Sequence, residues 1–312
     1  MSVLLDKRME DAMRLVKDYM NDTLLRHELN ALTEATFCFN FESWVTNGYF
    51  EGDYIPYSLE ENGKILSNVS VNRMHFIQNG EKRYYLQLGT VMTASDHRKQ
   101  GLARKLMEHM LEEYDGKCDG IYLFANLSAL DFYRKMGFTE RMQYRYSLRE
   151  DVRQELLQDG ARPKLQRNGF VKPDSSDAAA KMAYCEAVRA SVANGAFEQE
   201  NKYGLQMFYT SELENVYYSK DLECFAAMEL DGETLVLHSV ICPKQVSLDR
   251  VIGEINLEYK ELRLGFTPRQ NEMDLFEASV FDGGDDYRLF CMGSELESIE
   301  QEKLYFPTFS HA

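Results

Sequence analysis

Cysteines are few and widely spaced, so the chain lacks the pattern of a disulfide scaffold or a zinc ribbon. Six are present among 312 residues, and none belongs to a Cys-x-x-Cys pair. Most of their neighbours are apolar, which predicts buried, reduced thiols, no metal site and a cytoplasmic location. A disulfide or a zinc site is the alternative that this spacing leaves open.

Long apolar runs are also absent, so no segment is expected to cross a membrane. The first residues carry Asp6, Glu10 and Asp11, unlike a secretory signal. Positive charge is in the minority, with 35 Lys and Arg against 51 Asp and Glu, for a net charge of −16. That balance argues against nucleic acid or an anionic membrane as the main partner. It would attract amines such as polyamines, aminoglycosides or lysine side chains; alternatively, it only keeps the protein soluble.

The most informative stretch is residues 90–103, where a strand pattern stops, a basic turn follows and a helical pattern begins. The turn reads Arg98-Lys99-Gln100-Gly101, and Leu102 and Ala103 open the helix. A helix N-terminus behind a glycine presents free backbone N–H groups, and the missing Cβ lets an anion approach. The stretch has neither the Gly-x-x-x-x-Gly-Lys-Ser/Thr nor the Gly-x-Gly-x-x-Gly spacing. It predicts a site for a phosphate-bearing ligand; a solvated basic turn is the alternative.

A second segment at residues 121–138 strengthens the first interpretation. Ile121 to Phe124 has the pattern of a short buried strand, and a helix should follow, with Ser128 as its N-cap and Gly137 as its end. Together the two segments resemble the GNAT N-acetyltransferase superfamily. Arg98-x-x-Gly101-x-Ala103 is similar to its pyrophosphate motif, and Asn126-x-x-Ala129-x-x-Phe132-Tyr133-x-Lys135-x-Gly137-Phe138 to its second cofactor motif. The resemblance covers about residues 1–150.

The resemblance implies an acetyl-CoA site and a role for each matching residue. Val91, Met92 and Thr93 would hold the pantetheine arm and the acetyl carbonyl through their backbone. The coenzyme A pyrophosphate would lie on the turn residues, which are Arg98, Lys99, Gln100, Gly101, Leu102 and Ala103. Asn126 would contact the cofactor arm, and Tyr133 would protonate the departing thiolate.

The other elements of the first half also follow the family's order. The patterns predict helices over 4–20 and 23–35, then strands over 54–59, 65–76 and 84–92. The aromatic segment 37–53 contains the only tryptophan, Trp44. In the resembled family this region borders the acceptor cleft, where rings and carboxylates could hold a cationic amine. The carboxylates concerned are Glu34, Glu42, Glu51 and Asp53; alternatively, the rings only fill the core.

A general base is not evident in the sequence. The motif strand offers Gln87, which cannot usefully accept a proton, and His75 on the preceding strand is a candidate that could equally be structural. An ordered water or an already neutral amine would remove the need for such a base.

The second half shows a helix, a hairpin, a helix and further strands, which is again a GNAT-like order. A polar stretch with Gly160, Pro163, Gly169 and Pro173 separates it from the first half. No second pyrophosphate motif is present. We therefore expect an α+β fold, with a GNAT acetyl-CoA-binding domain over 1–150, a linker over 151–175 and a GNAT-like domain without the cofactor motif over 176–312.

The chain becomes apolar and aromatic from Leu304 to Ala312, after an acidic run at 295–302. Frayed ends are normally polar, so this segment should be packed. In the Eis-type acetyltransferases that the chain distantly resembles, the terminal carboxylate serves as the base. The resemblance makes the Ala312 carboxylate or His311 a candidate base; an edge strand that closes the second domain is the alternative.

These features predict an acetyl-CoA-dependent N-acetyltransferase that moves the acetyl group directly to a primary amine of a small or peptidic acceptor. A non-catalytic GNAT-fold sensor that binds acyl-CoA is the alternative from another class. A homo-oligomer is compatible with the sequence, which identifies neither the acceptor nor the acyl chain length.

Overall fold

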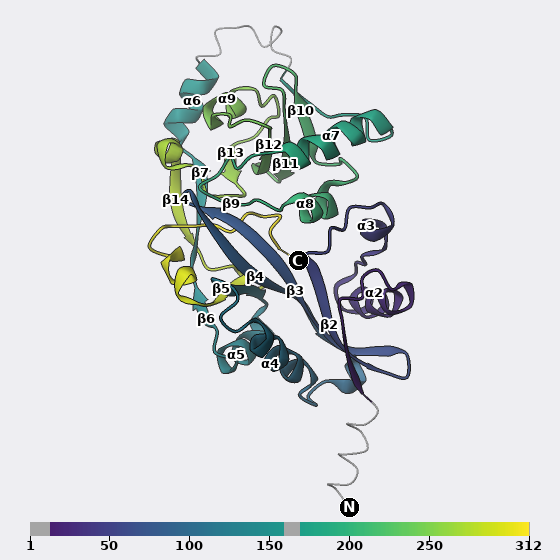
Figure 1. The fold of residues 1–312 in the computed structure, drawn as a ribbon. Coiled ribbons are helices and arrows are strands. Elements are labelled where there is room, and N and C mark those ends of the chain that lie inside the picture. The colour runs from purple at the N-terminus through teal and green to yellow at the C-terminus, as the bar shows by residue number, and fades with distance from the viewer. Residues whose placement is uncertain (1–12, 159–168, 312) are drawn as a thin grey trace, which may run out of the picture.

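The computed structural model describes residues 13–158 and 169–311, which form two β-sheets. Figure 1 shows the first sheet in its lower part and the second in its upper part, with helices on their outer faces. The two-domain α+β architecture expected from the sequence is confirmed.

The first sheet has the strand order β1-β2-β3-β4-β5-β15-β6, and β9 adds to β3. All neighbouring strands are antiparallel except β4 and β5, which are parallel. The strands are β1 Arg14–Lys17, β2 Tyr54–Glu61, β3 Lys64–Gln78, β4 Glu81–Thr93, β5 Gly120–Ala125, β6 Thr139–Arg141, β9 Phe197–Gln199 and β15 Arg288–Met292.

The second sheet has the order β14-β7-β13-β12-β11-β10-β8. Its only parallel pair among the described strands is β12 and β13, which corresponds to β4 and β5 of the first sheet. The strands are β7 Gln143–Leu148, β8 Phe170–Val171, β10 Val216–Ser219, β11 Cys224–Asp231, β12 Thr234–Ile241, β13 Glu261–Leu264 and β14 Phe276–Phe281.

The two halves of the chain exchange a strand. β15, from the second half, lies between β5 and β6, while β7, from the first half, lies between β13 and β14. The exchange is tightly packed, since Phe290 on β15 is fully buried in the core of the first sheet. The expected division near residue 150 therefore does not coincide with the division between the sheets.

Helices cover both faces of the first sheet (Figure 1). Leu106, Met107 and Met110 of α4 pack on one face with β4 and β5, and Leu29 and Trp44 pack on the other. The helices are α2 Thr23–Phe37, α3 Glu42–Thr46, α4 Leu102–Tyr114, α5 Leu130–Lys135, α6 Glu150–Gln158, α7 Ala178–Ala190, α8 Tyr203–Thr210 and α9 Leu248–Gly253.

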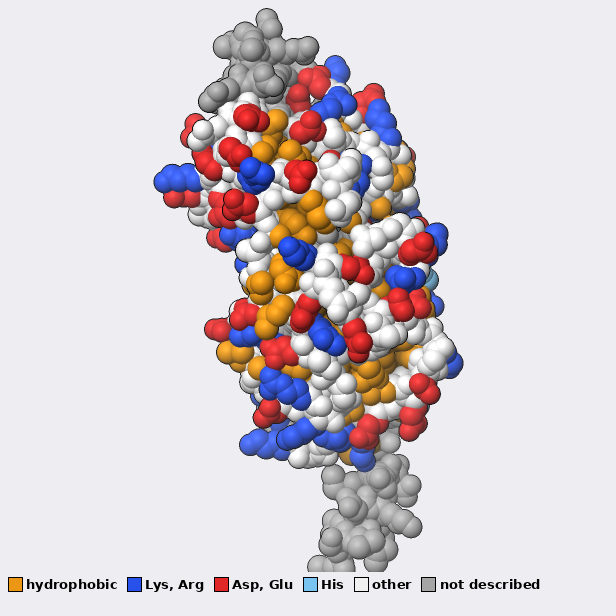
Figure 2. All heavy atoms as spheres, turned by 90° about the vertical axis from the view of Figure 1, so that its left-hand side faces the viewer, with side chains coloured by type: hydrophobic (Ala, Val, Ile, Leu, Met, Phe, Trp, Pro, Cys, Tyr) orange, Lys and Arg blue, Asp and Glu red, His pale blue; other side chains and the backbone are white. Residues whose placement is uncertain are grey.

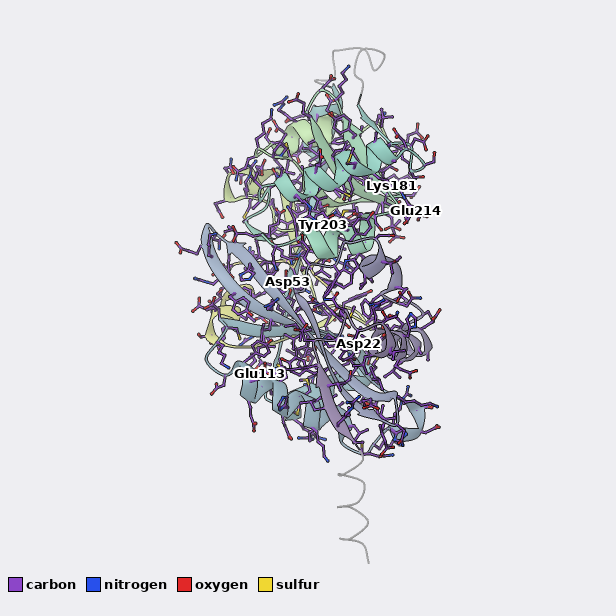
Figure 3. The ribbon with its side chains drawn as sticks, turned by 45° about the vertical axis from the view of Figure 1, so that its right-hand side comes forward. Asp22, Asp53, Glu113, Lys181, Tyr203 and Glu214 are labelled. Atoms are coloured by element: carbon purple, nitrogen blue, oxygen red, sulfur yellow. The ribbon has the colours of Figure 1, made fainter. Side chains whose placement is uncertain are left out.

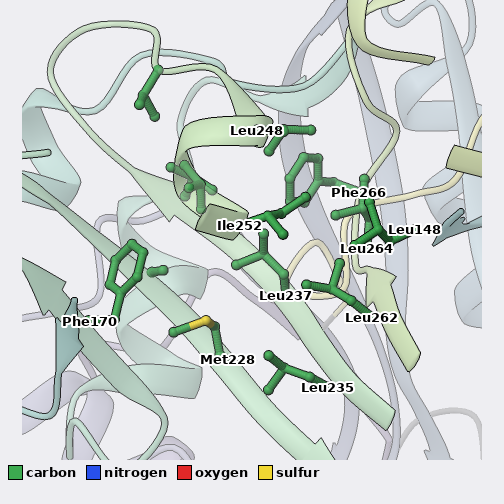
Figure 4. Close-up of a cluster of buried hydrophobic side chains, with 14 of the residues drawn as sticks. Leu148, Phe170, Met228, Leu235, Leu237, Leu248, Ile252, Leu262, Leu264 and Phe266 are labelled. Carbon is green, nitrogen blue, oxygen red and sulfur yellow. The ribbon is translucent and has the colours of Figure 1, made fainter. Parts of the chain in front are cut away.

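The second sheet has its own core on the side of α9. Alternate residues of β12 and β13, such as Leu237 and Leu264, point inward and meet Leu248 and Ile252 of α9 (Figure 4). Each half thus repeats the same scheme, in which a parallel pair of strands is covered by the helix that connects them.

The C-terminal segment packs between the two halves, as its apolar composition predicts. Phe306 is fully buried, and its ring stacks on Tyr122 with centres 4.1 Å apart. Phe76 and Phe197 stack beside it at 4.6 Å. Residues 304–311 form no strand, so they are not the edge strand considered as an alternative.

Polar contacts also link the halves. Asn201 Nδ2 donates to Asp53 Oδ2 at 2.8 Å, and Trp44 Nε1 donates to the Gly204 carbonyl at 2.7 Å. Figure 3 shows Asp53 and Tyr203 near the junction where the two halves meet.

Three local expectations are wrong. Residues 14–17, placed in a helix over 4–20, form β1, because pairing with β2 from Arg14↔Glu60 to Lys17↔Tyr57 satisfies their backbone. The other predicted residues of that helix up to 12 lie outside the described residues. Ser128 is not the N-cap of α5, because a short 3-10 turn, Leu127–Ala129, precedes that helix and is capped by Asn126, whose side chain accepts a hydrogen bond from the Ser128 N–H. The start of the expected linker is helical, in α6.

Charged side chains of both signs are interspersed over the face shown in Figure 2, with apolar groups between them. Within residues 13–158 and 169–311, no helix is long and apolar enough to cross a membrane. In the same ranges, no three His, Cys, Asp or Glu side chains gather as a metal site. All six cysteines are free, and Cys38 is exposed rather than buried.

Candidate active site

The first sheet opens between β4 and β5, at the end of the predicted motif strand. The two strands pair in parallel from Tyr85↔Gly120 to Leu88↔Leu123. β4 then continues to Thr93 and β5 to Ala125, with no further pairing between them in the part of the chain described. Backbone groups of β4 beyond Leu88 that point toward β5 are therefore available to a ligand.

A β-bulge turns this end of β4. The register with β3 shifts between Asn68 and Ser70, and Thr90 has φ of +43°. Buried side chains hold the bulge, because Asn68 Nδ2 donates to the Thr90 carbonyl at 2.9 Å and Tyr54 Oη lies 2.6 Å from Thr90 Oγ1. Bulges that re-aim backbone and side chains are common beside active sites.

A cavity of about 490 Å³ lies at this opening. The strand ends contribute Gly89, Thr90, Val91 and Ala125 to its lining. Its other walls are mainly aromatic: Phe37, Phe39, Phe41, Trp44, Tyr54, Phe124, Tyr133, Phe208, Tyr209 and Tyr287. The predicted residues Val91, Asn126 and Tyr133 lie in this lining, whereas no residue of the basic turn from Arg98 to Ala103 does.

Two other predicted residues of the strand point elsewhere. The Met92 side chain is buried in the core beneath α2, and Thr93 Oγ1 lies 2.9 Å from Ser67 Oγ. Only their backbone could meet a ligand in the opening, which is the role that the resemblance assigns to them.

The basic turn lies at the N-terminus of α4. Gly101 is the N-cap, with φ of +80°, and no side chain caps the helix within the described residues. The first-turn N–H groups of a helix are otherwise without partners, so they can bind an anion. Arg98, Lys99 and Gln100 are exposed beside them, and a Cβ built on Gly101 meets no atom within 4 Å. The turn is thus an open, positively charged surface.

Tyr133, on α5, lies between the cavity and the core. It is 6% exposed, and burial raises the pKa of its phenol well above the ordinary value of 10. The side chain therefore keeps its proton at neutral pH, which is the state a general acid needs.

The C-terminal segment reaches the same cavity. His311 is part of the lining, its ring centre lies 3.8 Å from that of Phe124, and its Nε2 is buried with no hydrogen-bond partner among the described residues. Burial lowers the pKa of His311 to about 3, so its imidazole is neutral. Ala312, the other candidate base, lies outside the described residues.

The carboxylates considered for amine binding and the imidazole of His75 do not line the cavity. Glu42 pairs with Arg26, Glu51 with Arg189 and Asp53 with Arg73, while Glu34 is exposed. His75 is exposed and its ring stacks on Tyr84, with centres 4.9 Å apart. Gln87 does line the cavity, where its Oε1 accepts from Asn72 Nδ2 at 3.1 Å.

Sequence reasoning missed the part of the wall that comes from the second half. Leu205, Phe208 and Tyr209 of α8 line the cavity, as do Asp286 and Tyr287, which precede β15. Nothing in the local pattern of α8 distinguishes it from an ordinary buried helix, so only the tertiary structure reveals its role.

The corresponding opening in the second sheet is filled by the chain itself. Beyond the last parallel pair, Leu237↔Leu264, the Thr308 N–H donates to the Gly265 carbonyl at 2.8 Å. At the N-terminus of α9, the Leu248 N–H donates to the buried Glu272 carboxylate at 2.8 Å. This carboxylate, which also pairs with Arg269, already takes the place of an anion there, so this half is not shaped for the same ligand.

Comparison with known proteins finds a family to which part of this chain is similar. Residues 7–141 match the family model described as an acetyltransferase (GNAT) domain. N-alpha-acetyltransferase 50 of Danio rerio is 38% identical over 71 residues, which are 21% of this chain and 40% of that protein. The match therefore spans less than half the length of this curated relative.

Solved structures resemble both halves together. A GCN5-related N-acetyltransferase from Kribbella flavida aligns with a TM-score of 0.54 and 16% identity, over 89% of this chain and 70% of that one. Eis1 from Mycobacterium abscessus aligns with a TM-score of 0.50 and 10% identity, over 93% of this chain and 76% of that one. At such identities the likeness concerns the fold, and it extends across both sheets.

Proposed function

Because the chain carries a GNAT acetyltransferase domain over residues 7–141, we propose that it transfers an acetyl group from acetyl-CoA to a primary amine. One observation carries the proposal. The cavity of about 490 Å³ lies where β4 and β5 part, and the chain leads from this end of β4 to the uncapped N-terminus of α4. The acceptor is a small or peptidic amine.

The residues present fit coenzyme A. The free N–H groups of the first turn of α4, together with Arg98 and Lys99, suit a pyrophosphate. Open space at Gly101 lets that group reach the backbone. The unpaired edge of β4 beyond Leu88 suits the amide groups of the pantetheine arm, and Asn126 lies beside it in the cavity wall.

When bound, acetyl-CoA supplies a thioester carbonyl that an uncharged amine can attack, with the thiol as leaving group. The strand end at Thr90 and Val91 offers backbone N–H groups to polarise that carbonyl. Tyr133 lines the same cavity in its protonated form and donates a proton to the leaving sulfur. The groups proposed to polarise the carbonyl and to protonate the leaving sulfur therefore line one cavity.

The attacking amine must lose its protons, and the cavity favours this in two ways. Its apolar walls disfavour an ammonium, which lowers the pKa of a bound amine. The neutral imidazole of His311 offers the unpartnered Nε2 as an acceptor for an N–H of the nucleophile. The Ala312 carboxylate is the second candidate acceptor, as the resemblance to Eis-type enzymes implies.

A thiol-release assay tests the proposal. The full chain is incubated with acetyl-CoA and a panel of primary amines, and free coenzyme A is measured beside the acetylated product. We expect amine-dependent release with equimolar product. Binding of acetyl-CoA by calorimetry without release on any amine would instead show the non-catalytic sensor.

A further inference from the structure

The walls of the cavity indicate which kind of amine it takes. Phe208 of α8 lines the cavity and contacts three rings of the first half. Its ring centre is 5.7 Å from that of Phe39, 6.0 Å from Phe41 and 5.5 Å from Trp44, in tilted and edge-on contacts. These are the favourable arrangements of packed aromatic rings. The acceptor side is therefore an aromatic box built jointly by the two halves.

Hydrogen bonds at the outer ends of the rings fix this box. Trp44 Nε1 donates to the Gly204 carbonyl at 2.7 Å, which ties the indole to the start of α8. Tyr209 Oη donates to the His311 carbonyl at 2.8 Å, which ties α8 to the C-terminal segment. A wall held in this way is already arranged for an apolar ligand and loses little freedom on binding.

Charge is almost absent from the same surface. Asp286 is the one charged side chain in the described lining, and it is exposed to solvent. Nearby carboxylates are committed to basic partners: Arg26 Nε donates to Glu42 Oε2 at 3.0 Å, and Arg189 Nη1 donates to Glu51 Oε1 at 2.5 Å. A second ammonium group on the acceptor would lose its hydration without meeting a counter-charge. Polycations are therefore poor ligands for this cavity, despite the net charge of −16.

We propose that the acceptor is a small amine with a single primary amino group on an aromatic or bulky apolar body. This assignment rests on the proposed acetyl transfer. The apolar body lies among Phe39, Phe41, Trp44 and Phe208, and the amino group lies toward the strand ends. Ring faces and Asp286 attract the incoming cation, and the apolar interior then favours its uncharged, nucleophilic form.

A kinetic comparison of two amines tests the assignment. Phenylethylamine carries one amino group and a ring, whereas cadaverine carries two amino groups on a flexible chain. With saturating acetyl-CoA, we expect kcat/KM for phenylethylamine to exceed that for cadaverine by at least about tenfold. A preference for cadaverine, with turnover confirmed, would overturn the assignment and leave the acetyl transfer intact.

Variants test whether the aromatic box causes the preference for phenylethylamine over cadaverine. Phe208→Ala should lower kcat/KM for phenylethylamine by about tenfold or more and leave that for cadaverine nearly unchanged. Phe281→Ala is the matched control, because Phe281 lies on β14 against Tyr305, outside the cavity. If Phe208→Ala instead alters the choice between acetyl-CoA and octanoyl-CoA, the box holds the acyl chain, and the assignment is wrong.

A binding measurement separates this inference from the proposed function. Trp44 is the only tryptophan of the chain and lines the cavity, so its fluorescence reports ligands directly. Phenylethylamine should quench it saturably and cadaverine should not. Quenching without coenzyme A release would refute the transfer while the ligand class stands. No quenching by phenylethylamine, in the presence or absence of coenzyme A, would refute the ligand class.

Discussion

The hydroxyl of Tyr54 lies 2.6 Å from Oγ1 of Thr90, the residue at which β4 adopts a left-handed backbone conformation. Ser70 Oγ donates to the same tyrosine at 2.6 Å. Positive φ at a β-branched residue costs about 1–3 kcal/mol and persists only where the surroundings enforce it. Tyr54 is therefore a positioning residue for the strand end that meets the ligand.

Replacing this tyrosine tests that role. Tyr54→Phe removes the hydroxyl and leaves buried partners unsatisfied, so it should lower the free energy of unfolding by about 1–3 kcal/mol. It should also lower kcat/KM for acetyl-CoA, because the bulge loses a support. Tyr57→Phe is the control, since that hydroxyl donates to Glu113 on the other face of β2. Equal effects of the two variants on kcat/KM would contradict the positioning role.

Gly101 should be needed for coenzyme A binding because the ligand occupies the space beside its Cα. Gly101→Asn introduces a side chain into that space, and asparagine tolerates the left-handed conformation that φ of +80° requires. We expect the variant to fold and to bind coenzyme A at least about tenfold more weakly in calorimetry.

Gly116 offers a matched control for this test. It has φ of +65° and open space at its Cβ position, but it follows the C-terminal end of α4. Gly116→Asn should therefore leave the affinity for coenzyme A unchanged. Unchanged affinity in Gly101→Asn as well would refute the assignment of the turn as the pyrophosphate site.

Tyr133 should act on turnover more than on binding. Its pKa is raised by burial, so at neutral pH it can donate a proton but not accept one. Removal of a general acid typically lowers the rate by about 10²–10⁴-fold, and Tyr133→Phe should therefore reduce kcat while the affinity for acetyl-CoA is kept. Tyr146→Phe, in the second sheet, controls for the loss of a buried hydroxyl. A kcat near the wild-type value with rate-limiting chemistry would show that Tyr133 only packs.

His311 should make the protein sensitive to acid. Its folded pKa of about 3 lies below the ordinary value near 6.5, so between these pH values the unfolded chain binds a proton that the folded chain does not. Its contribution to stability is complete above about pH 6.5 and is lost as the pH falls toward 3, by up to about 1.4 kcal/mol per unit. His311→Gln should flatten the decline of unfolding free energy over this range, and a decline as steep as that of the wild type would contradict this role.

The same histidine should matter for catalysis. Deleting His311 and Ala312 removes the imidazole that accepts the N–H of the nucleophile and the candidate Ala312 base, so kcat at neutral pH should fall sharply with little change in thermal stability. A protein extended at its C-terminus, in which residue 312 carries no free carboxylate, separates the two candidates. Full activity in an extended protein would exclude the Ala312 carboxylate as the base.

The sequence positions expected to bind the cofactor are local, so their relative arrangement could be predicted. The strand end, the basic turn and the start of α4 are contiguous from Val91 to Ala103, and the resemblance to the GNAT superfamily assigns their roles. Asn126 and Tyr133 follow in a second contiguous motif. Residues that are adjacent in sequence stay close together in the fold, so the arrangement within each motif can be predicted from the sequence.

The acceptor side is not predictable in this way because it depends on distant partners. The sequence analysis considered Glu51 for binding a cationic amine, but in the structure it pairs with Arg189, which is 138 residues away. Phe208 enters the cavity wall only because α8 packs against the aromatic segment near Trp44. The exchange of β7 and β15 between the two sheets could not be predicted from the sequence either. An apolar alternation shows that a strand is buried, but not which strand it pairs with.

A single-turnover experiment with acetyl-CoA labelled in its acetyl group tests the central claim most directly. Enzyme in excess over labelled acetyl-CoA is mixed with an excess of amine, and the label is followed on cofactor, amine and protein. The account predicts that label leaves acetyl-CoA at the rate at which N-acetylated amine forms, with none found on the protein at any time. Label that stays on bound acetyl-CoA whatever amine is added would contradict it and identify the cavity as the site of a non-catalytic acyl-CoA sensor.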